Sequence, residues 1–349
     1  MKNLIRRTAA IALACGIAGV PAFAQTSGKS KTLDTVKSRG TLSCGVNPGL
    51  AGFSIPDDKG NWTGIDADFC RAVAVAIFND PKKIKFIPLS AKDRFTALQT
   101  GEIDVLARNG TWTMSREADL GLMWAGVNYY DGQAFMVRKK LVTSALELSQ
   151  ATICVQQGTT TELNLADFFR ANNMKYEVVA FATNAEAVKA YDSGRCDAYT
   201  TDASGLYAER TKLANPADHI ILPEIISKEP LGPAVRQGDD IWLNIVKWSL
   251  FAMINAEELG VTKSNVDAML KSKKPEIKRL LGVEGDFGKN LGLTKDWAYR
   301  IVKHVGNYGE SFERNVGSAS RLKIDRGLNA LWSNPDPKKR GLMYAPPIR

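Results

Sequence analysis

The sequence predicts an α/β protein of two lobes, each built on a parallel-rich sheet flanked by helices. The chain has 349 residues, which is enough for two domains on a prior of about 150 residues each. Short apolar segments alternate with amphipathic ones, and strands that alternate with helices are typical of parallel sheets. The alternation starts again near residue 151, so we expect one sheet in each half.

Each half repeats one order of elements. In the first half we predict strands at 41–47, 83–89 and 102–108 and helices at 64–78 and 92–101. In the second half we predict strands at 151–157, 175–181 and 196–202 and helices at 162–173 and 185–194. The first helix has apolar residues three and four positions apart, and Gly101 is a typical helix stop.

The first 24 residues have the pattern of a cleaved signal peptide. A basic start precedes an apolar stretch that ends in the small-x-small pattern Ala22-Phe23-Ala24. A membrane anchor needs about 20 apolar residues, and this stretch is shorter and is broken by Gly and Pro. A lipoprotein at Cys15 is disfavoured because the usual Leu three positions earlier is missing. We therefore expect an exported protein with no later membrane span.

The net charge is mildly positive. Its value of +9 falls by three to +6 when the leader, which contains Lys2, Arg6 and Arg7, is removed. The excess is richest in the C-terminal third, and a basic tail can indicate nucleic acid binding. Aromatic residues do not interleave with these basic residues, so a solvated face is the favoured interpretation. We predict no nucleic acid partner.

The cysteine pattern favours disulfides. Five Cys are present and Cys15 leaves with the leader, so four remain: Cys44, Cys70, Cys154 and Cys196. An even number in an exported chain indicates disulfides, although the count alone leaves the pairing open. No pair has C-x-x-C spacing, and the two His stand far apart. We therefore predict no metal and no cofactor.

Polar segments follow four of the predicted strands, at 47–53, 108–116, 157–162 and 201–205. Ligands of open α/β sheets bind beyond the carboxyl ends of the strands. Three of these segments are rich in small hydroxyl, amide or Gly residues. Two lobes in one chain therefore predict a polar cleft between them.

The segment at 157–162 has two compatible interpretations. Thr159 and Glu162 fit the capping box, in which a hydroxyl caps a helix and an acid follows three residues later. A capped helix N-terminus also has spare N–H groups and a positive dipole end, which suit a carboxylate. Thr160, one residue further in, is the better ligand candidate.

Opposite charges stand at Arg116 and Asp202. An Arg near a helix start is more often a surface residue, but the helix dipole disfavours a cation there, which mildly favours another role for Arg116. A guanidinium can hold a carboxylate through two parallel bonds. Thr111 could donate to the same anion. Asp202 could cap the following helix or pair with an ammonium. An Arg in one lobe and an Asp in the other would hold both charges of an α-amino acid.

The stretch Gly64-Ile65-Asp66-Ala67-Asp68-Phe69 resembles the signature of family 3 periplasmic solute-binding proteins, which serve amino acid uptake by ABC transporters. Ala67 departs from the larger aliphatic residue or Thr that is usual there, and the pattern R-x-D-A at 195–198 accompanies the motif. The resemblance covers about residues 35–285, and 286–349 resembles the C-terminal extension of the general L-amino acid-binding subfamily. It implies the type II periplasmic binding protein fold, a periplasmic location, a membrane permease as partner and a monomer.

The resemblance also implies roles for residues of this sequence. The carboxylate-binding Arg falls on Arg116, the donors of the same loop on Asn109 and Thr111, the second-lobe donor on Thr160, and the ammonium-binding Asp on Asp202.

Three positions depart where the ligand side chain is expected. Binders of basic amino acids commonly have an acid where this chain has Asn47, and their aromatic wall becomes Ala91. A residue that is usually small is Arg108. These changes predict a roomier, broad-range site. Arg108 could favour acidic or amide side chains, or it could point to solvent.

The implied fold also gives lobe bounds. Lobe I is expected at 33–133 and 231–285, lobe II at 137–228, and the extension 286–349 against lobe I. The chain would cross between the lobes at 129–140 and at 229–235. Expected neighbours in this fold imply the disulfides Cys44–Cys70 and Cys154–Cys196, each within one lobe.

An exported enzyme on the same fold, such as a dehydratase acting on an amino acid precursor, is the alternative. Catalysis needs an acid or base at the reacting atom. Besides Asp202, the acids in the cleft segments are Glu117 and Glu162, and the cap explains Glu162. We therefore predict a binding protein rather than an enzyme. A docking module for a chemoreceptor would use the same ligand site, so that possibility stays open.

Overall fold

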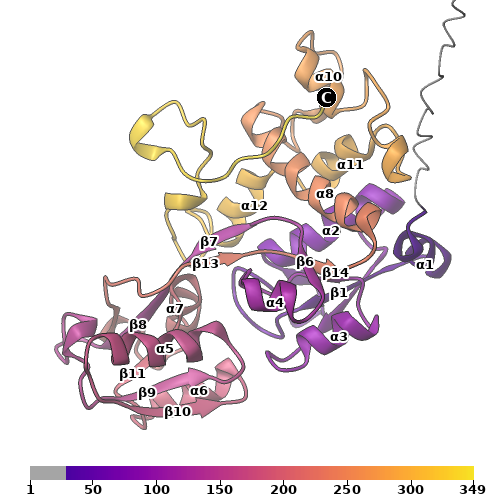
Figure 1. Cartoon of the computed structure of the whole chain (residues 1–349). Helices are drawn as coiled ribbons and strands as arrows, with labels where there is room; N and C mark the ends of the chain where they lie inside the picture. The colour runs from indigo at the N-terminus through magenta and orange to yellow at the C-terminus, as the bar shows by residue number, and fades with distance from the viewer. Residues whose placement is uncertain (1–28) are drawn as a thin grey trace, which may run out of the picture.

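The computed structural model describes residues 29–349. Figure 1 shows two bodies joined by a narrow pair of strands, with the C-terminal helices beside the first body. We call the body that contains the first sheet lobe I and the body that contains the second sheet lobe II. The predicted signal peptide, residues 1–24, lies outside the described residues.

Lobe I is centred on a sheet with the strand order β4-β1-β5-β14-β6. The first three strands are parallel, and β14 runs antiparallel to both of its neighbours. Every residue of β1 is buried, as is typical of a strand that is covered on both faces. The strands are β1 (Leu42–Val46), β4 (Ile84–Pro88), β5 (Val105–Leu106), β6 (Leu122–Trp124) and β14 (Ala234–Arg236).

Five helices and a short hairpin complete the core of lobe I. They are α1 (Lys31–Arg39), α2 (Ile65–Phe78), α3 (Arg94–Thr100), α4 (Met114–Ala118), α8 (Asp240–Glu258) and the hairpin β2 (Ile55–Pro56) with β3 (Trp62–Thr63). Helix α2 packs on β1, β4 and α8. It ends at Asn79, whose φ of 56° is left-handed, a conformation that Asn accepts at a helix end.

Lobe II has a second sheet of the same plan, in the order β10-β9-β11-β8-β12. Again the first three strands are parallel and the fourth is antiparallel to its neighbours. The strands are β8 (Gln133–Arg138), β9 (Thr152–Gln156), β10 (Glu177–Phe181), β11 (Ala198–Asp202) and β12 (His219–Ile221). The helices are α5 (Thr160–Ala171), α6 (Asn184–Asp192) and α7 (Ala203–Arg210), with 3₁₀ turns η1 (Ala145–Glu147) and η2 (Pro216–Asp218).

The two crossings between the lobes lie side by side. Strand β7 (Tyr129–Asp131) pairs antiparallel with β13 (Glu229–Leu231), and together they form the ribbon that joins the bodies in Figure 1. The first crossing continues directly into β8, and the second continues into β14. The fourth strand of each sheet therefore arrives from the other lobe.

One predicted strand is shorter than expected. The segment at 102–108 contributes only β5, Val105–Leu106. The carboxylate of Asp104 instead accepts the N–H of Ser43 at 2.8 Å, and Arg108 donates its Nε–H to the carbonyl of Leu89 at 2.8 Å. Polar side chains at both ends of the apolar run thus bond outside the regular ladder.

The C-terminal extension packs on lobe I. Two short helices, α9 (Val266–Met269) and α10 (Pro275–Leu280), precede it. The extension itself contains η3 (Lys289–Leu291), α11 (Trp297–His304), α12 (Tyr308–Asn315), η4 (Gly327–Asn329) and η5 (Pro337–Lys339). Helix α11 contacts α2 and α8, and the side chains of both α11 and α12 belong to the lobe I core. Asp68 of α2 anchors α12 by accepting hydrogen bonds from Ser311 at 2.8 Å and from Arg314 at 2.7 Å.

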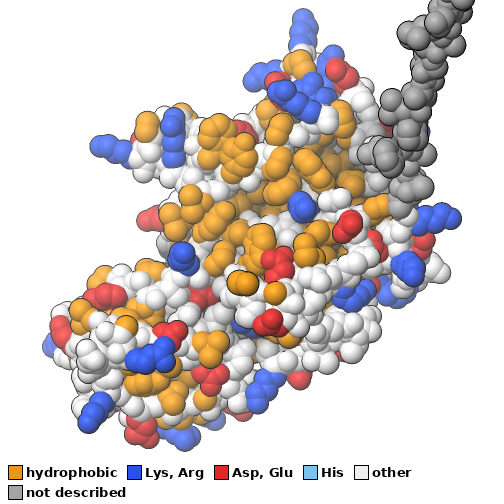
Figure 2. Space-filling model, in the orientation of Figure 1, with side chains coloured by type: hydrophobic (Ala, Val, Ile, Leu, Met, Phe, Trp, Pro, Cys, Tyr) orange, Lys and Arg blue, Asp and Glu red, His pale blue; other side chains and the backbone are white. Residues whose placement is uncertain are grey.

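The last segment of the chain forms part of an exposed apolar surface. Trp332 is 46 % exposed and Tyr344 is 57 % exposed, and their rings stand edge to face at 5.3 Å. Together with Leu259 and Leu280 they line a hollow of about 250 Å³. Figure 2 shows hydrophobic side chains gathered over this part of lobe I.

Each lobe contains one disulfide. Cys44 of β1 is bonded to Cys70 of α2, and Cys154 of β9 is bonded to Cys196, just before β11. These are the two pairs that the family resemblance implied. Within residues 29–349, no helix is both long and apolar enough to span a bilayer.

Candidate functional site

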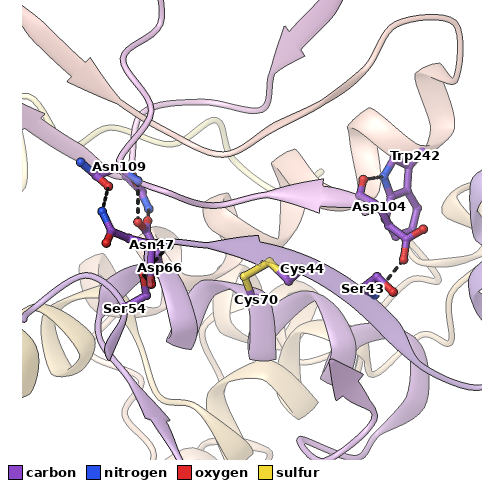
Figure 3. The surroundings of a disulfide bond; sticks show 10 residues. Ser43, Cys44, Asn47, Ser54, Asp66, Cys70, Asp104, Asn109 and Trp242 are labelled. Atoms are coloured by element: carbon purple, nitrogen blue, oxygen red, sulfur yellow. Dashed lines mark hydrogen bonds between the residues drawn. A yellow bond between two sulfur atoms is a disulfide. The ribbon is translucent and has the colours of Figure 1, made fainter. Parts of the chain in front are cut away.

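The loop after β5 forms the lobe I wall of the cleft, and Asp66 holds it in shape. The Asp66 carboxylate accepts the N–H of Asn109 at 2.7 Å (Figure 3). It also accepts the side-chain amide of Asn128 at 2.9 Å. Asn109 has a φ of 35°, a conformation in which Asn is enriched. Burial raises the pKa of Asp66 to about 6. The first acid of the "GIDADF" stretch thus positions the ligand loop.

Arg116 lies on the short helix α4 with its side chain turned inward. The residue is 9 % exposed, and its Nη1 donates to the carbonyl of Thr111 at 2.8 Å. The guanidinium stands over the ring of Phe95 at 5.0 Å. Burial lowers the pKa of Arg116, while Glu229 and Asp202 oppose that change. The remaining N–H groups of this guanidinium are free of protein partners among the described residues and can hold an anion.

Arg94 is a second buried guanidinium that sequence reasoning missed. It is 3 % exposed, it stacks on Phe95 at 4.7 Å, and its Nε has no hydrogen-bond partner among the described residues. Its pKa lies well below the usual value because of burial and of the nearby Arg108 and Arg116. A cation in the first turn of α3 opposes the helix dipole. The same signal that marked Arg116 could have found it.

Arg108 adds a third cation to this wall. The residue is only 3 % exposed, so the alternative in which it points to solvent is wrong. Burial lowers its pKa to about 10, and Asp66 and Asp202 oppose the change. The Arg108 side chain remains charged because the carboxylates of Asp66 and Asp202 oppose the lowering of its pKa.

Asp202 lies across the cleft, at the end of β11. It stands at the N-cap position of α7, but its side chain makes no capping bond, so the interpretation of Asp202 as a helix cap is wrong. Burial and repulsion from Asp131 and Glu229 raise its pKa well above the usual value, while the nearby Arg94 and Asn109 lower it. The carboxylate therefore faces the lobe I loop rather than its own helix.

Glu229, on the hinge strand β13, is the main site residue that the sequence did not reveal. Its carboxylate accepts hydrogen bonds from Thr111 at 2.5 Å, Thr160 at 2.9 Å, Asn164 at 2.6 Å and Ser227 at 2.7 Å. The two Thr hydroxyls were expected to donate to a ligand carboxylate, yet in this structure their protons go to Glu229. A hydroxyl has one proton and two lone pairs, so here both can only accept from a ligand.

The two lobes touch across the cleft. The hydroxyls of Thr111 and Thr160 lie 3.3 Å apart, and Lys212 of lobe II donates to the carbonyl of Gly49 of lobe I at 3.0 Å. Asn47 is part of the lobe I wall, where its amide donates to the Asn109 side chain at 3.1 Å. The structure thus brings Thr111 to Thr160 and Asn47 to Asn109, while the roles of the predicted ligand residues stay predictions.

The N-terminus of α5 differs in one bond from the predicted capping box. Thr159 accepts the N–H of Glu162 at 3.3 Å, as expected for a cap. The Glu162 carboxylate, however, accepts the N–H of Gly158 at 2.9 Å. The return bond has moved by one residue, so the N–H of Thr159 does not bond to Glu162 as it would in a full capping box.

The arrangement suits a small molecule with both charges. Guanidiniums on one wall can hold a carboxylate through paired charge-assisted bonds, and carboxylates on the other wall can hold an ammonium. Hydroxyls and amides between them satisfy neutral polar atoms. Buried charges need partners of opposite sign, and a zwitterion supplies both.

Known proteins resemble the chain over most of its length. Residues 42–264 match the bacterial extracellular solute-binding proteins, family 3. The chain is 61 % identical over 335 residues to the general L-amino acid-binding periplasmic protein AapJ of Rhizobium johnstonii, covering 95 % of this chain and 97 % of the relative. It is 54 % identical over 341 residues to the glutamate/glutamine/aspartate/asparagine-binding protein BztA of Rhodobacter capsulatus, covering 97 % of each.

A solved structure shares the whole architecture. An ABC transporter periplasmic binding protein from Brucella ovis, with glutathione bound, has a TM-score of 0.89 and 61 % sequence identity, covering 92 % of this chain and 100 % of that one.

Proposed function

The chain belongs to the bacterial extracellular solute-binding proteins of family 3, and from that premise we propose that it captures L-amino acids for an ABC transporter. It takes up the ligand in the periplasm by closing lobe I onto lobe II. The membrane permease is its partner, and the protein works as a monomer. The observation that carries the proposal is that buried guanidiniums on one wall stand opposite buried carboxylates on the other.

Two charged contacts define which end of the ligand goes where. Arg116 and the free N–H groups at the start of α5 suit the α-carboxylate, because both lie where the lobes meet at Thr160. Asp202 suits the α-ammonium, since its carboxylate is buried without a capping bond. The α-carboxylate thus contacts both lobes and the ammonium contacts lobe II, so the ligand favours the closed form.

The lobe I wall supports acidic and amide side chains as preferred ligands. Arg94 and Arg108 are both 3 % exposed, and the Nε of Arg94 has no partner among the described residues. A γ-carboxylate or side-chain amide oxygen would supply that partner. The small side chain of Ala91, which is buried beside this wall, leaves room for other side chains and supports a broad range.

A dehydratase-like enzyme is the less supported alternative. The relatives named above are binding proteins by their names. Glu229 accepts hydrogen bonds from the hydroxyls of Thr111 and Thr160, and Arg94 lowers the pKa of Asp202, which binding alone explains.

The test is a titration of ligand-free protein. The mature chain is unfolded and refolded to remove any carried ligand and is then titrated calorimetrically with all L-amino acids, D-glutamate and glutathione, the molecule bound in the Brucella ovis structure. We expect tight binding of glutamate, aspartate and their amides, weaker binding of aliphatic L-amino acids, and little binding of D-glutamate. Silence across the whole panel would overturn the proposed function.

A further inference from the structure

A cavity between the lobes shares Asn47 and Arg108 with the proposed amino acid site. Its volume is about 500 Å³, within the range of about 300–1,000 Å³ that is typical of small-molecule sites. It begins at Asn47 and Arg108, where the end of the ligand side chain is expected, and it runs to Asn184, Glu209 and Lys212 of lobe II. A cavity of this size and position is open to a ligand that is longer than a free amino acid.

The far end of the cavity has both an acceptor and a donor. Glu209 is 1 % exposed, and the Lys212 ammonium lies 3.0 Å from each of its two carboxylate oxygens. The same ammonium donates to the carbonyl of Gly49 across the cleft at 3.0 Å. A carboxylate oxygen can accept more than one hydrogen bond, so Glu209 can also accept a ligand N–H. The Lys212 ammonium, which is partly exposed, suits a carboxylate beyond that N–H.

We propose that this cavity is a second subsite that takes the residue attached to the side chain of a γ-glutamyl peptide. In such a peptide the α-ammonium and α-carboxylate of the glutamyl residue stay free for the amino acid site. Its side-chain carbonyl lies at Arg108, the following amide N–H reaches Glu209, and the terminal carboxylate lies near Lys212. The inference rests on the proposed function, because the glutamyl end must occupy the amino acid site.

The direction of the peptide link discriminates this subsite from loose packing in the cleft. An α-linked glutamyl peptide has its α-carboxyl group consumed by the amide, so Arg116 loses its carboxylate. A γ-linked peptide of the same composition keeps both charges and places its second residue in the cavity. The two isomers therefore have equal size and formal charge but only one fits both subsites.

The experiment titrates refolded, ligand-free protein with L-glutamate, γ-glutamylalanine and α-glutamylalanine. We expect γ-glutamylalanine to bind within about tenfold of glutamate and α-glutamylalanine to bind at least about a hundredfold more weakly, in line with the loss of a buried charge pair. Glutamate binding without γ-glutamylalanine binding would overturn the inference and leave the proposed function intact. Silence with all three would overturn both.

Two variants locate the subsite. Glu209→Gln and Lys212→Ala should each weaken γ-glutamylalanine relative to glutamate by about three- to tenfold. Lys212→Ala also removes the cross-lobe bond to Gly49, which acts on every ligand, so the ratio of the two affinities is the readout. Lys189→Ala, on an exposed position of α6, is the matched control and should leave the ratio unchanged. An unchanged ratio in both test variants would overturn the placement.

Discussion

Lobe I lines the cleft with three buried guanidiniums, whereas lobe II and the hinge line it with three carboxylates, of which two are buried. The cations are Arg94, Arg108 and Arg116, and the acids are the buried Asp202 and Glu229 and the half-buried Asp131. Burial, together with repulsion inside each wall, lowers the pKa of Arg94 and raises the pKa of Asp202. Across the cleft the charges attract. Like charges therefore repel one another within each wall when it stands alone, and closure or a bound zwitterion offsets that repulsion on both walls.

The walls also differ in what supports them. The core of lobe I extends through α2 and α8 into the C-terminal extension, while lobe II has two smaller clusters, one on each face of its sheet. The extension also reaches the hinge, where Asn329 accepts the N–H of Tyr130 at 2.7 Å and donates to its carbonyl at 3.0 Å. Lobe I and the hinge therefore have the larger core and the contacts of the extension, and lobe II has the smaller core.

The largest expected effect comes from removing one charge from each wall. Arg116→Ala and Asp202→Asn should each weaken L-glutamate binding by on the order of 2–5 kcal/mol, because each leaves one ligand charge unpaired in a closed cleft. Calorimetric titration measures the loss, and Arg170→Ala, on an exposed position of α5, is the control. Wild-type affinity in Arg116→Ala would show that the carboxylate is held elsewhere.

The Asp202→Asn variant should also change the unfolding free energy of the ligand-free protein. Asp202→Asn removes a carboxylate that burial and two acidic neighbours disfavour, so we expect the free energy of unfolding to rise at pH 8 even though binding is lost. This gain should vanish as pH falls below the ordinary Asp pKa, because wild-type Asp202 is then protonated in both states. A fall in stability at pH 8 would contradict the assigned repulsion.

Removing the disulfides compares the supports of the two lobes. Replacing Cys154 and Cys196 by Ser should lower the free energy of unfolding by roughly 3–4 kcal/mol on chain entropy. Replacing Cys44 and Cys70 should cost somewhat less, because that bond closes a sequence separation of 26 rather than 42 residues. Urea denaturation of the oxidised proteins measures both. A larger loss of unfolding free energy on removing the lobe I disulfide would contradict the view that lobe II, with the smaller core, depends more on its disulfide.

A smaller effect is expected at the hinge. Asn329→Ala should lower the free energy of unfolding by about 1–3 kcal/mol, because it leaves both backbone groups of Tyr130 without their partner. Thermal unfolding measures the change. Asn290→Ala, at an exposed position of the same extension, is the control and should change little. Equal effects in the two variants would mean that the hinge contact contributes nothing of its own.

The smallest effect is a pH dependence of binding. An ammonium binds the ionised form of Asp202, whose pKa in the ligand-free protein is raised by burial and by Asp131 and Glu229. Affinity should therefore fall as pH is lowered through that raised pKa, by up to about tenfold per pH unit for one proton released. Titration in two buffers of different ionisation enthalpy counts the protons. Asp202→Asn should show a flatter profile, and proton uptake in the wild type would contradict the assignment.

Much of the fold followed from local patterns. The strand and helix alternation, and the restart near residue 151, predicted both sheets because each element carries its own periodicity. Gly101, predicted as a helix stop, has a φ of 83° just after α3. Arg116 and Asp202 stood out because a charge next to a helix start or a strand end has few purely local uses.

Other features depend on neighbours that are distant in the chain. Asp202 was open to two interpretations because a local cap and a cleft residue look alike in sequence, and only the fold brings Asp131 and Asn109 to it. Arg94 had the same sequence signal as Arg116, a cation in the first turn of a helix, but only the fold buries it beside Arg108 and Arg116. Glu229 was seen only as the first residue of a hinge segment, yet its four donors come from segments as far apart as residues 111 and 227.

By itself the sequence determined the two-lobed α/β plan, the export pattern and the residue types that can hold a zwitterion, since periodicity, composition and motifs are properties of the chain. The tertiary structure alone decided which charges face one another and which hydroxyl protons are already engaged. It also decided where the cavity beyond Arg108 runs. The physical reason is that pairing and burial are set by distances between segments, and those distances exist only once both lobes have folded and met at the hinge.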